Sequence, residues 1–154
     1  MATISKKLQI VIKNLAINDV YQKESRSFCV EDFDPKFFDL PDTLQIQQMH
    51  IIERSEVVKV EGNGELLRVF VKLGTRWVLS QDEEPNVKAA IESEFIAEYK
   101  IQESLDQDCI DEFALKNASY HVWPYWREYL SSQCERMRLP RVILPTVQFN
   151  KQPN

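Results

Sequence analysis

The clearest pattern in this chain is a regular alternation of two sets of positions over residues 91–101. Because successive side chains of a strand point to opposite faces, the pattern predicts a half-buried antiparallel strand. A weaker alternation over residues 8–12 predicts another strand, with Leu8, Ile10 and Ile12 facing inward. The residues expected on the inner face of the clearer strand are Ile91, Ser93, Phe95, Ala97, Tyr99 and Ile101.

A Gly-Asn-Gly sequence at residues 62–64 separates two further β-like runs, residues 44–60 and 66–79. Glycine and asparagine tolerate a positive φ, so this sequence predicts a tight reversal between two strands. Gly74 inside the second run suggests a bend. The first run has an irregular pattern, which leaves its inner face undefined.

Two helical segments follow the strands. Residues 106–117 carry apolar side chains at helical spacing after an aspartate that could cap the helix. Residues 124–137 carry a single apolar stripe. Pro124 suits the first helical position, and the helix is expected to end before Pro140. Strands followed by helices indicate an α+β fold, with residues 1–154 forming one domain.

Charge and cysteine usage narrow the class of protein. The net charge of −5 argues against general nucleic-acid binding, which needs a basic face to neutralise phosphates. Residues 1–7 lack the apolar core of a secretion signal, and no run is long enough to span a membrane. Cys29, Cys109 and Cys134 are odd in number and far apart, so no disulfide scaffold is expected. A cytoplasmic location follows from these features.

Candidate chemistry is sparse. The two histidines, His50 and His121, have no compact set of further ligands around them, so we expect no metal site and no cofactor. Glu92, Glu94 and Glu98 share one strand face, as the solvent side of a sheet or as carboxylates for acid–base work. His121 could be a packed or surface residue, or pair with a cysteine nucleophile. A small-ligand-binding or enzymatic α+β domain using Glu92, Glu94 or His121 is therefore an alternative, and a deep enclosed polar pocket would favour it.

Residues 30–41 hold more large apolar groups than a solvated loop should carry, and Pro35 interrupts them. These groups could cap one end of the core. They could equally form a groove that accepts extended apolar segments of other chains, bordered by residues from the C-terminal run 142–149.

The segment WPYWRE at residues 123–128, followed by LPRVILP at 139–145, resembles the C-terminal half of the SecB family of protein-export chaperones. The closing sequence PTVQF at residues 145–149 is similar to the Pro-Val-Asn-Phe ending of that family. In place of the family's glycine-rich turn after the main helix, this chain has Met137-Arg138.

The resemblance implies an α+β fold in which a four-stranded, or slightly extended, antiparallel sheet carries helices on one face. It also implies a homo-oligomer, a dimer of dimers, that acts as an ATP-independent holdase without a metal or cofactor. Its partners would be unfolded polypeptides, in export with the SecA translocase ATPase or for a dedicated client such as an antitoxin. An adaptor that binds one folded partner through the aromatic loop is a third hypothesis.

This hypothesis assigns roles to two groups of residues. Trp123, Trp126 and Leu130 are expected to be structural or to lie at the oligomer interface. The residues expected to contact clients are Phe33, Phe37, Phe38, Leu40, Leu144, Val147 and Phe149.

Overall fold

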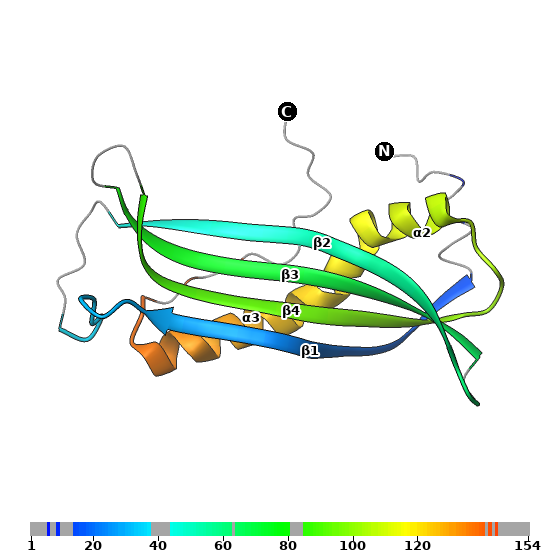
Figure 1. Cartoon of the computed structure of the whole chain (residues 1–154), viewed down its shortest axis with the longest axis horizontal. Coiled ribbons are helices and arrows are strands. Elements are labelled where there is room, and N and C mark those ends of the chain that lie inside the picture. Colours follow the sequence, from blue (N-terminus) through cyan, green and yellow to red (C-terminus); the bar gives the residue numbers. More distant parts are fainter. Residues whose placement is uncertain are drawn as a thin grey trace.

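The chain folds around one antiparallel sheet with the strand order β1-β4-β3-β2 (Figure 1). A computed structural model describes residues 6, 9, 14–37, 44–62, 64–80, 85–140, 142 and 144. The strands are β1 (Leu15–Cys29), β2 (Leu44–Val60), β3 (Gly64–Ser80) and β4 (Pro85–Ile101). The helical part follows as α2 (Gln107–Phe113), the π-helical turn η1 (Ala114–Ala118) and α3 (Ser119–Met137).

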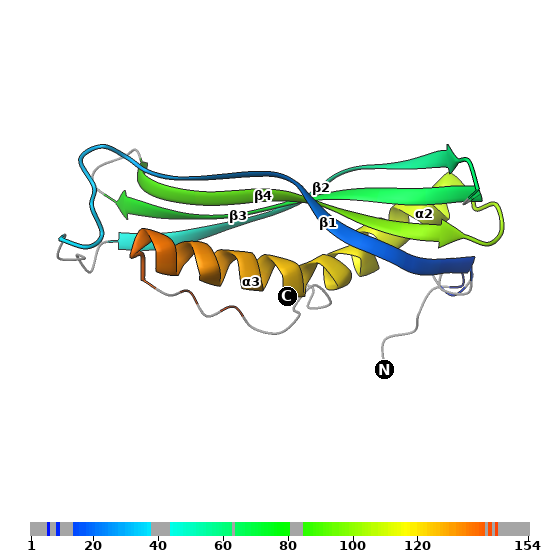
Figure 2. The ribbon, with the colours of Figure 1, turned by 90° about the horizontal axis from the view of Figure 1, so that it is seen from below.

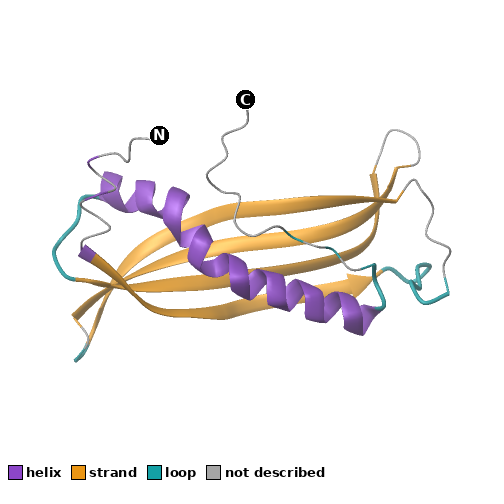
Figure 3. Cartoon of the chain, turned by 180° about the vertical axis from the view of Figure 1, so that it is seen from behind, coloured by secondary structure: helices purple, strands orange, loops and turns teal. Residues whose placement is uncertain are grey.

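The helices pack on one face of the sheet, so the expected α+β architecture is confirmed. Figure 2 shows α3 running along that face, and Figure 3 shows its diagonal course across the strands. The rings of Phe113 from α2 and Tyr99 from β4 meet edge to face, with centroids 4.8 Å apart. We call this side of the sheet the helix face, and the side opposite α3 the open face.

The core lies between the helix face and the helices, and β3 and β4 supply most of its sheet side. The alternation predicted for β4 is confirmed, because Ile91, Ser93, Phe95, Ala97 and Tyr99 are all buried, while Ile101 is partly buried. Tyr99, Trp77 and Trp126 are among the largest side chains that are completely buried. Burial of such aromatic groups supplies much of the hydrophobic stabilisation of a domain of this size.

The open face is less exposed than the sequence predicts. Ile96 and Glu94 were expected on the solvent side of the sheet, yet both are buried. Phe70 on the neighbouring strand β3 is buried as well, beneath the Arg54 guanidinium at 3.8 Å from its ring centroid. Long charged side chains lie flat over this face and cover it with their aliphatic stems.

The N-terminal strand prediction is wrong. Gln9 is helical, and β1 begins only at Leu15. Leu8, Ile10 and Ile12 lie outside the described residues. β1 shows no regular alternation in the sequence. Register shifts between Ile17 and Asp19 and between Gln22 and Glu24 break its two-residue period.

The turn between β2 and β3 is as predicted. Gly62 and Gly64 both have a positive φ, at 86° and 70°, and Val60 pairs with Gly64 across the hairpin. At Gly74 the pairing of β3 with both neighbours continues without a register shift, so no bulge marks the position of the expected bend. The glycine instead makes room for side chains that lie close above it.

The elements α2, η1 and α3 follow one another without a break and form one continuous helical segment, not two separate helices. Pro124 lies inside α3, which begins at Ser119, so the predicted start at Pro124 is wrong. Val122 and Trp123 are buried on the same side as the later stripe, and their burial offsets the cost of an internal proline. The helix ends at Met137, before Pro140, as expected.

Candidate functional site

Edge strand β2 carries the most apolar exposed surface of the sheet. Its neighbour on one side is β3, and within the described residues no strand pairs with its other side. Four apolar side chains of β2 are exposed, and we call them the β2 surface: Ile46, Ile51, Val57 and Val60. An exposed sheet edge with apolar side chains is suited to bind an extended segment of another chain.

The diagonal course of the helices leaves this strand uncovered. α3 contacts β4, β1 and β3, whereas β2 is reached by η1. Ile46 pairs in register with Trp77 and Val57 with Leu67, which places both on the helix face. The inner neighbours are buried by the helices while Ile46 and Val57 remain exposed, so the sheet extends as an apolar shelf beyond the helices.

One hydrogen bond ties the middle of β2 to the start of α3. His50 Nε2 lies 2.6 Å from the hydroxyl of Ser119, whose side chain is buried. Burial lowers the pKa of His50 below its usual value of 6.5. This contact fixes the strand against the helix at a point between Ile46 and Val57.

The aromatic loop divides into a buried part and an exposed part. Phe33 is only 2% exposed and belongs to the core cluster, so it cannot contact a client in this conformation. A short turn, closed by the Phe33 N–H donating to the Val30 carbonyl at 3.0 Å, directs its ring inward. Phe37 is 79% exposed, with the Lys36 ammonium 5.1 Å from its ring centroid. Phe38 and Leu40 lie outside the described residues.

The C-terminal candidates divide in the same way. Leu144 is buried and Val142 packs against the core, so Leu144 serves the core of this chain and is not available to a client. Val147 and Phe149 lie outside the described residues. Leu139, which directly follows α3, is buried as well, so the described residues of this segment pack against the core of the same chain.

The residues expected at an oligomer interface are part of the core. Trp123, Trp126 and Leu130 are all buried within this single chain, against the helix face of the sheet. Their burial is the structural role that the sequence left open. Tyr125 is the exposed aromatic of the same segment.

The residues of the enzymatic alternative lie on opposite sides of the sheet. His121 Nδ1 is 2.7 Å from the Tyr99 hydroxyl, beside a hollow of about 320 Å³ that reaches β1 on the helix face. Burial lowers the pKa of His121 and raises that of Tyr99. Glu92 and Glu94 line a different pocket on the open face. They therefore cannot form one catalytic site with His121.

Cysteine and metal chemistry find little support in the described part of the chain. All three cysteines are free, and burial raises the pKa of Cys134, which disfavours its thiolate. No group of three or more metal-ligating side chains is gathered among the described residues. None of the helices described is long and apolar enough to cross a membrane.

Comparison with known proteins identifies the class of fold. No protein-family model matches the chain, and no curated protein matches it in sequence. The structure is similar to that of Rv1957 of Mycobacterium tuberculosis, a SecB-like chaperone, in complex with a ChAD peptide from the Rv1956 HigA1 antitoxin. The alignment has a TM-score of 0.68 at 15% identity and covers 97% of this chain and 100% of the other.

A protein of unknown function from Streptococcus agalactiae also aligns, with a TM-score of 0.36 at 10% identity over 85% of this chain and 96% of the other. That similarity is too low to carry an argument. The first comparison shows that this chain has a SecB-like fold, in agreement with the resemblance found in the sequence.

Proposed function

We propose that this protein is a chaperone that holds extended apolar segments of non-native polypeptides without ATP. The observation that carries the proposal is the β2 surface, four exposed apolar side chains on an edge strand, of which Ile46 and Val57 lie on the helix face beyond the helices. Apolar area and unpaired backbone groups bind many sequences with little selectivity, which is what a holdase requires. The SecB-like fold supports the same function.

The proposed contacts combine the β2 surface with the exposed part of the aromatic loop. Phe37 is the described member of that loop, and Phe38, Leu40, Val147 and Phe149 stay in the proposal as predictions from the sequence. Phe33 and Leu144 are removed from it because both are buried. The proposed site is therefore centred on β2. The sequence predicts this strand, but its irregular pattern does not mark it as a binding site.

A dedicated client is the form of this function that we favour. The similar chaperone Rv1957 was solved with a peptide from an antitoxin, and an open edge strand is suited to bind a peptide segment. General export with SecA as partner is the second form. Both forms place the protein in the cytoplasm as a homo-oligomer, and a dimer of dimers is the assembly that the family resemblance suggests.

The test is suppression of aggregation when guanidinium-unfolded citrate synthase is diluted into buffer containing this protein. The double variant Ile46→Thr, Val57→Thr should protect less than the wild type, because it removes apolar area while keeping β-branched residues in the strand. Phe37→Ser should also protect less. Ile17→Thr is the matched control, since Ile17 is 54% exposed and lies on β1, at the opposite edge of the sheet.

Three results would count against the proposal. A wild-type protein that leaves aggregation unchanged is not a general holdase, and binding to native but not unfolded proteins would identify the adaptor instead. Equal protection by the double variant and the control would remove β2 from the site.

A further inference from the structure

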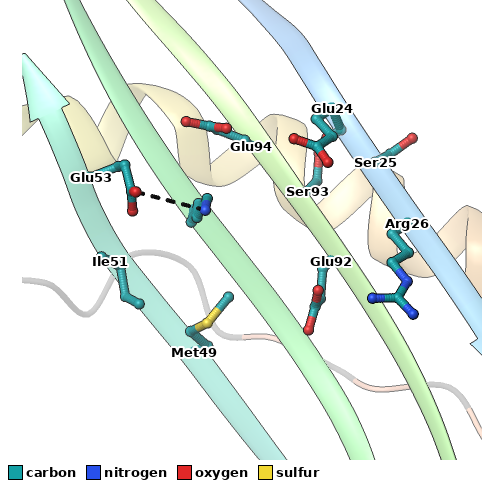
Figure 4. A pocket seen from close by; sticks show the side chains of 10 residues that line it. Glu24, Ser25, Arg26, Met49, Ile51, Glu53, Glu92, Ser93 and Glu94 are labelled. Carbon is teal, nitrogen blue, oxygen red and sulfur yellow. Dashed lines mark hydrogen bonds and ion pairs between the residues drawn. The ribbon is translucent and has the colours of Figure 1, made fainter.

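The open face of the sheet contains a pocket that shares only Ile51 with the β2 surface. Its volume is about 330 Å³, and it lies on the side of the sheet away from α3 (Figure 4). Side chains of three strands surround the space above Lys72 of β3. Those that matter for its chemistry are Glu24, Met49, Ile51, Glu92 and Glu94.

Gly74 is the reason that the sheet is hollow at this point. It pairs with Met49 on one side and with Glu92 on the other. A Cβ atom at Gly74 would lie 3.1 Å from Met49 Cε and 3.3 Å from Glu92 Cγ, closer than ordinary contacts. Because the glycine has no side chain, the side chains of both neighbours lie low over β3 and leave space above them.

The pocket holds an unmatched negative charge. Glu94 is only 5% exposed, and within the described residues its carboxylate has no hydrogen bond or ion pair. Two cations, Lys72 and Arg26, also line the pocket, and they face four glutamates, which leaves an excess of two negative charges. Lys72 pairs in register with Glu94, but neither cation forms an ion pair with it. Lys72 Nζ lies 3.8 Å from Glu53, and the Arg26 guanidinium lies 4.8 Å from the ring centroid of Phe28.

A carboxylate that is largely removed from water is costly unless a direct hydrogen bond or ion pair compensates its charge. Glu24 and Glu92 at the rim also have no ion pair among the described residues, so the local field favours a cation. Met49 and Ile51 form an apolar wall that suits the methylene stem of such a group.

We propose that this pocket binds an ammonium or guanidinium group carried on an alkyl chain, with Glu94 as its principal partner. The group could belong to a free diamine or guanidine, or to a lysine or arginine side chain of a bound polypeptide. In either case it enters over Gly74, lays its stem against Met49 and places its charge on Glu94. This site shares Ile51 with the β2 surface, but its charged groups are not part of that surface.

The experiment is isothermal titration calorimetry of the full chain with cadaverine, with agmatine, and with short blocked alanine peptides that contain one lysine or one arginine. The neutral alcohol 1-pentanol tests whether charge is required. Cations should bind and pentanol should not. Tighter binding of the free compounds identifies a small-molecule site, and tighter binding of the peptides identifies a polypeptide contact.

Glu94→Gln should weaken cation binding by about tenfold or more, as expected for loss of a charge-assisted hydrogen bond. Glu98→Gln is the matched control, because Glu98 lies on the same strand and face outside the pocket. Gly74→Ala keeps every charge but pushes Met49 and Glu92 upward, and should weaken binding several-fold.

A structural role for Glu94 makes a different prediction. Glu94→Gln removes a buried unpaired charge, so the unliganded variant should unfold at the same urea concentration as the wild type or at a higher one. No binding of any cationic probe overturns the proposal, and so does equal weakening by Glu94→Gln and Glu98→Gln. Failure of this test leaves the aggregation assay unaffected, so the two proposals fail separately.

Discussion

The backbone N–H of Leu139 donates a hydrogen bond to the carbonyl oxygen of Cys134 at 3.0 Å, across the end of α3. The Arg138 N–H donates to Glu135 at 3.3 Å, and Arg138 has a φ of 61°. Together these contacts form a Schellman motif, which ordinarily places glycine at the residue with positive φ. The buried Leu139 side chain holds the chain in this conformation despite the strain.

Replacing this arginine should stabilise the protein. The left-handed conformation costs a residue with a Cβ about 1–2 kcal/mol, a penalty that glycine avoids. We therefore expect Arg138→Gly to raise the free energy of unfolding by about 1 kcal/mol, measured by urea denaturation. Arg138→Ala should have little effect, because alanine keeps the Cβ. A loss of stability in the glycine variant would show that the arginine side chain contributes more than its backbone costs.

The burial of Trp126 and Leu130 within one chain leads to a prediction about assembly. Leu130→Ala should lower the free energy of unfolding by about 2–5 kcal/mol, the usual cost of a large-to-small change in a core. Because the side chain packs against this chain's own sheet, the loss should be the same at low and high protein concentration. A loss that shrinks as concentration rises would place Leu130 in an interface, with Leu115→Ala as the exposed control.

Short-range patterns in the sequence predict the central part of the sheet correctly. The alternation over residues 91–101 predicts β4 correctly because the strand is central, one of its faces lies under the helices and its period is unbroken there. The turn at Gly62 and Gly64 is predicted correctly because the positive φ that glycine favours is a local property of the backbone. Both signals are contained in a few neighbouring residues, and neither depends on distant parts of the chain.

The features that the sequence could not reveal depend on contacts between distant segments. Glu94 is buried because side chains of β1 and β2 close over β4, and its acidic side chain gives no hint of that. Phe33 has the same residue type as Phe37, and two successive turns place one ring in the core and the other at the surface. They are closed by the Phe33 N–H donating to the Val30 carbonyl and the Phe37 N–H donating to the Asp34 carbonyl. β2 carries exposed apolar side chains among exposed polar ones on both of its faces, and one sequence does not show which of them the helices leave open.

The two histidines predict how stability depends on pH. Burial lowers the pKa of His50 and of His121 in the folded protein below 6.5. The unfolded chain therefore binds more protons than the folded one between pH 6.5 and the lowered values, so stability should fall as the pH decreases through that range. Above pH 6.5 the contribution is present in full.

The measurement is the urea midpoint of unfolding at several values from pH 7.5 to pH 5. The double variant His50→Asn, His121→Asn should show a shallower loss on acidification than the wild type, whatever its stability at pH 7.5. Identical slopes would mean that the carboxylates alone set the pH dependence.

The change in stability on replacing Pro124 distinguishes a helix that begins at Pro124 from one that begins at Ser119. At the first position of a helix proline is favourable, so Pro124→Ala would be neutral or destabilising. Inside α3 its nitrogen carries no hydrogen to donate to the preceding turn, and alanine is better there by about 3 kcal/mol. Alanine also gives the unfolded chain more freedom, which offsets about 1 kcal/mol of that gain.

We therefore expect Pro124→Ala to raise the free energy of unfolding by about 2 kcal/mol. Pro124 is exposed, so the substitution leaves no cavity in the core. Urea denaturation gives the free energy, and amide hydrogen exchange at residues 119–123 shows whether the gain lies in the first turns of α3. A decrease in stability would indicate that the long helix begins at Pro124 after all, and that the turns before it are held only by the burial of Val122 and Trp123.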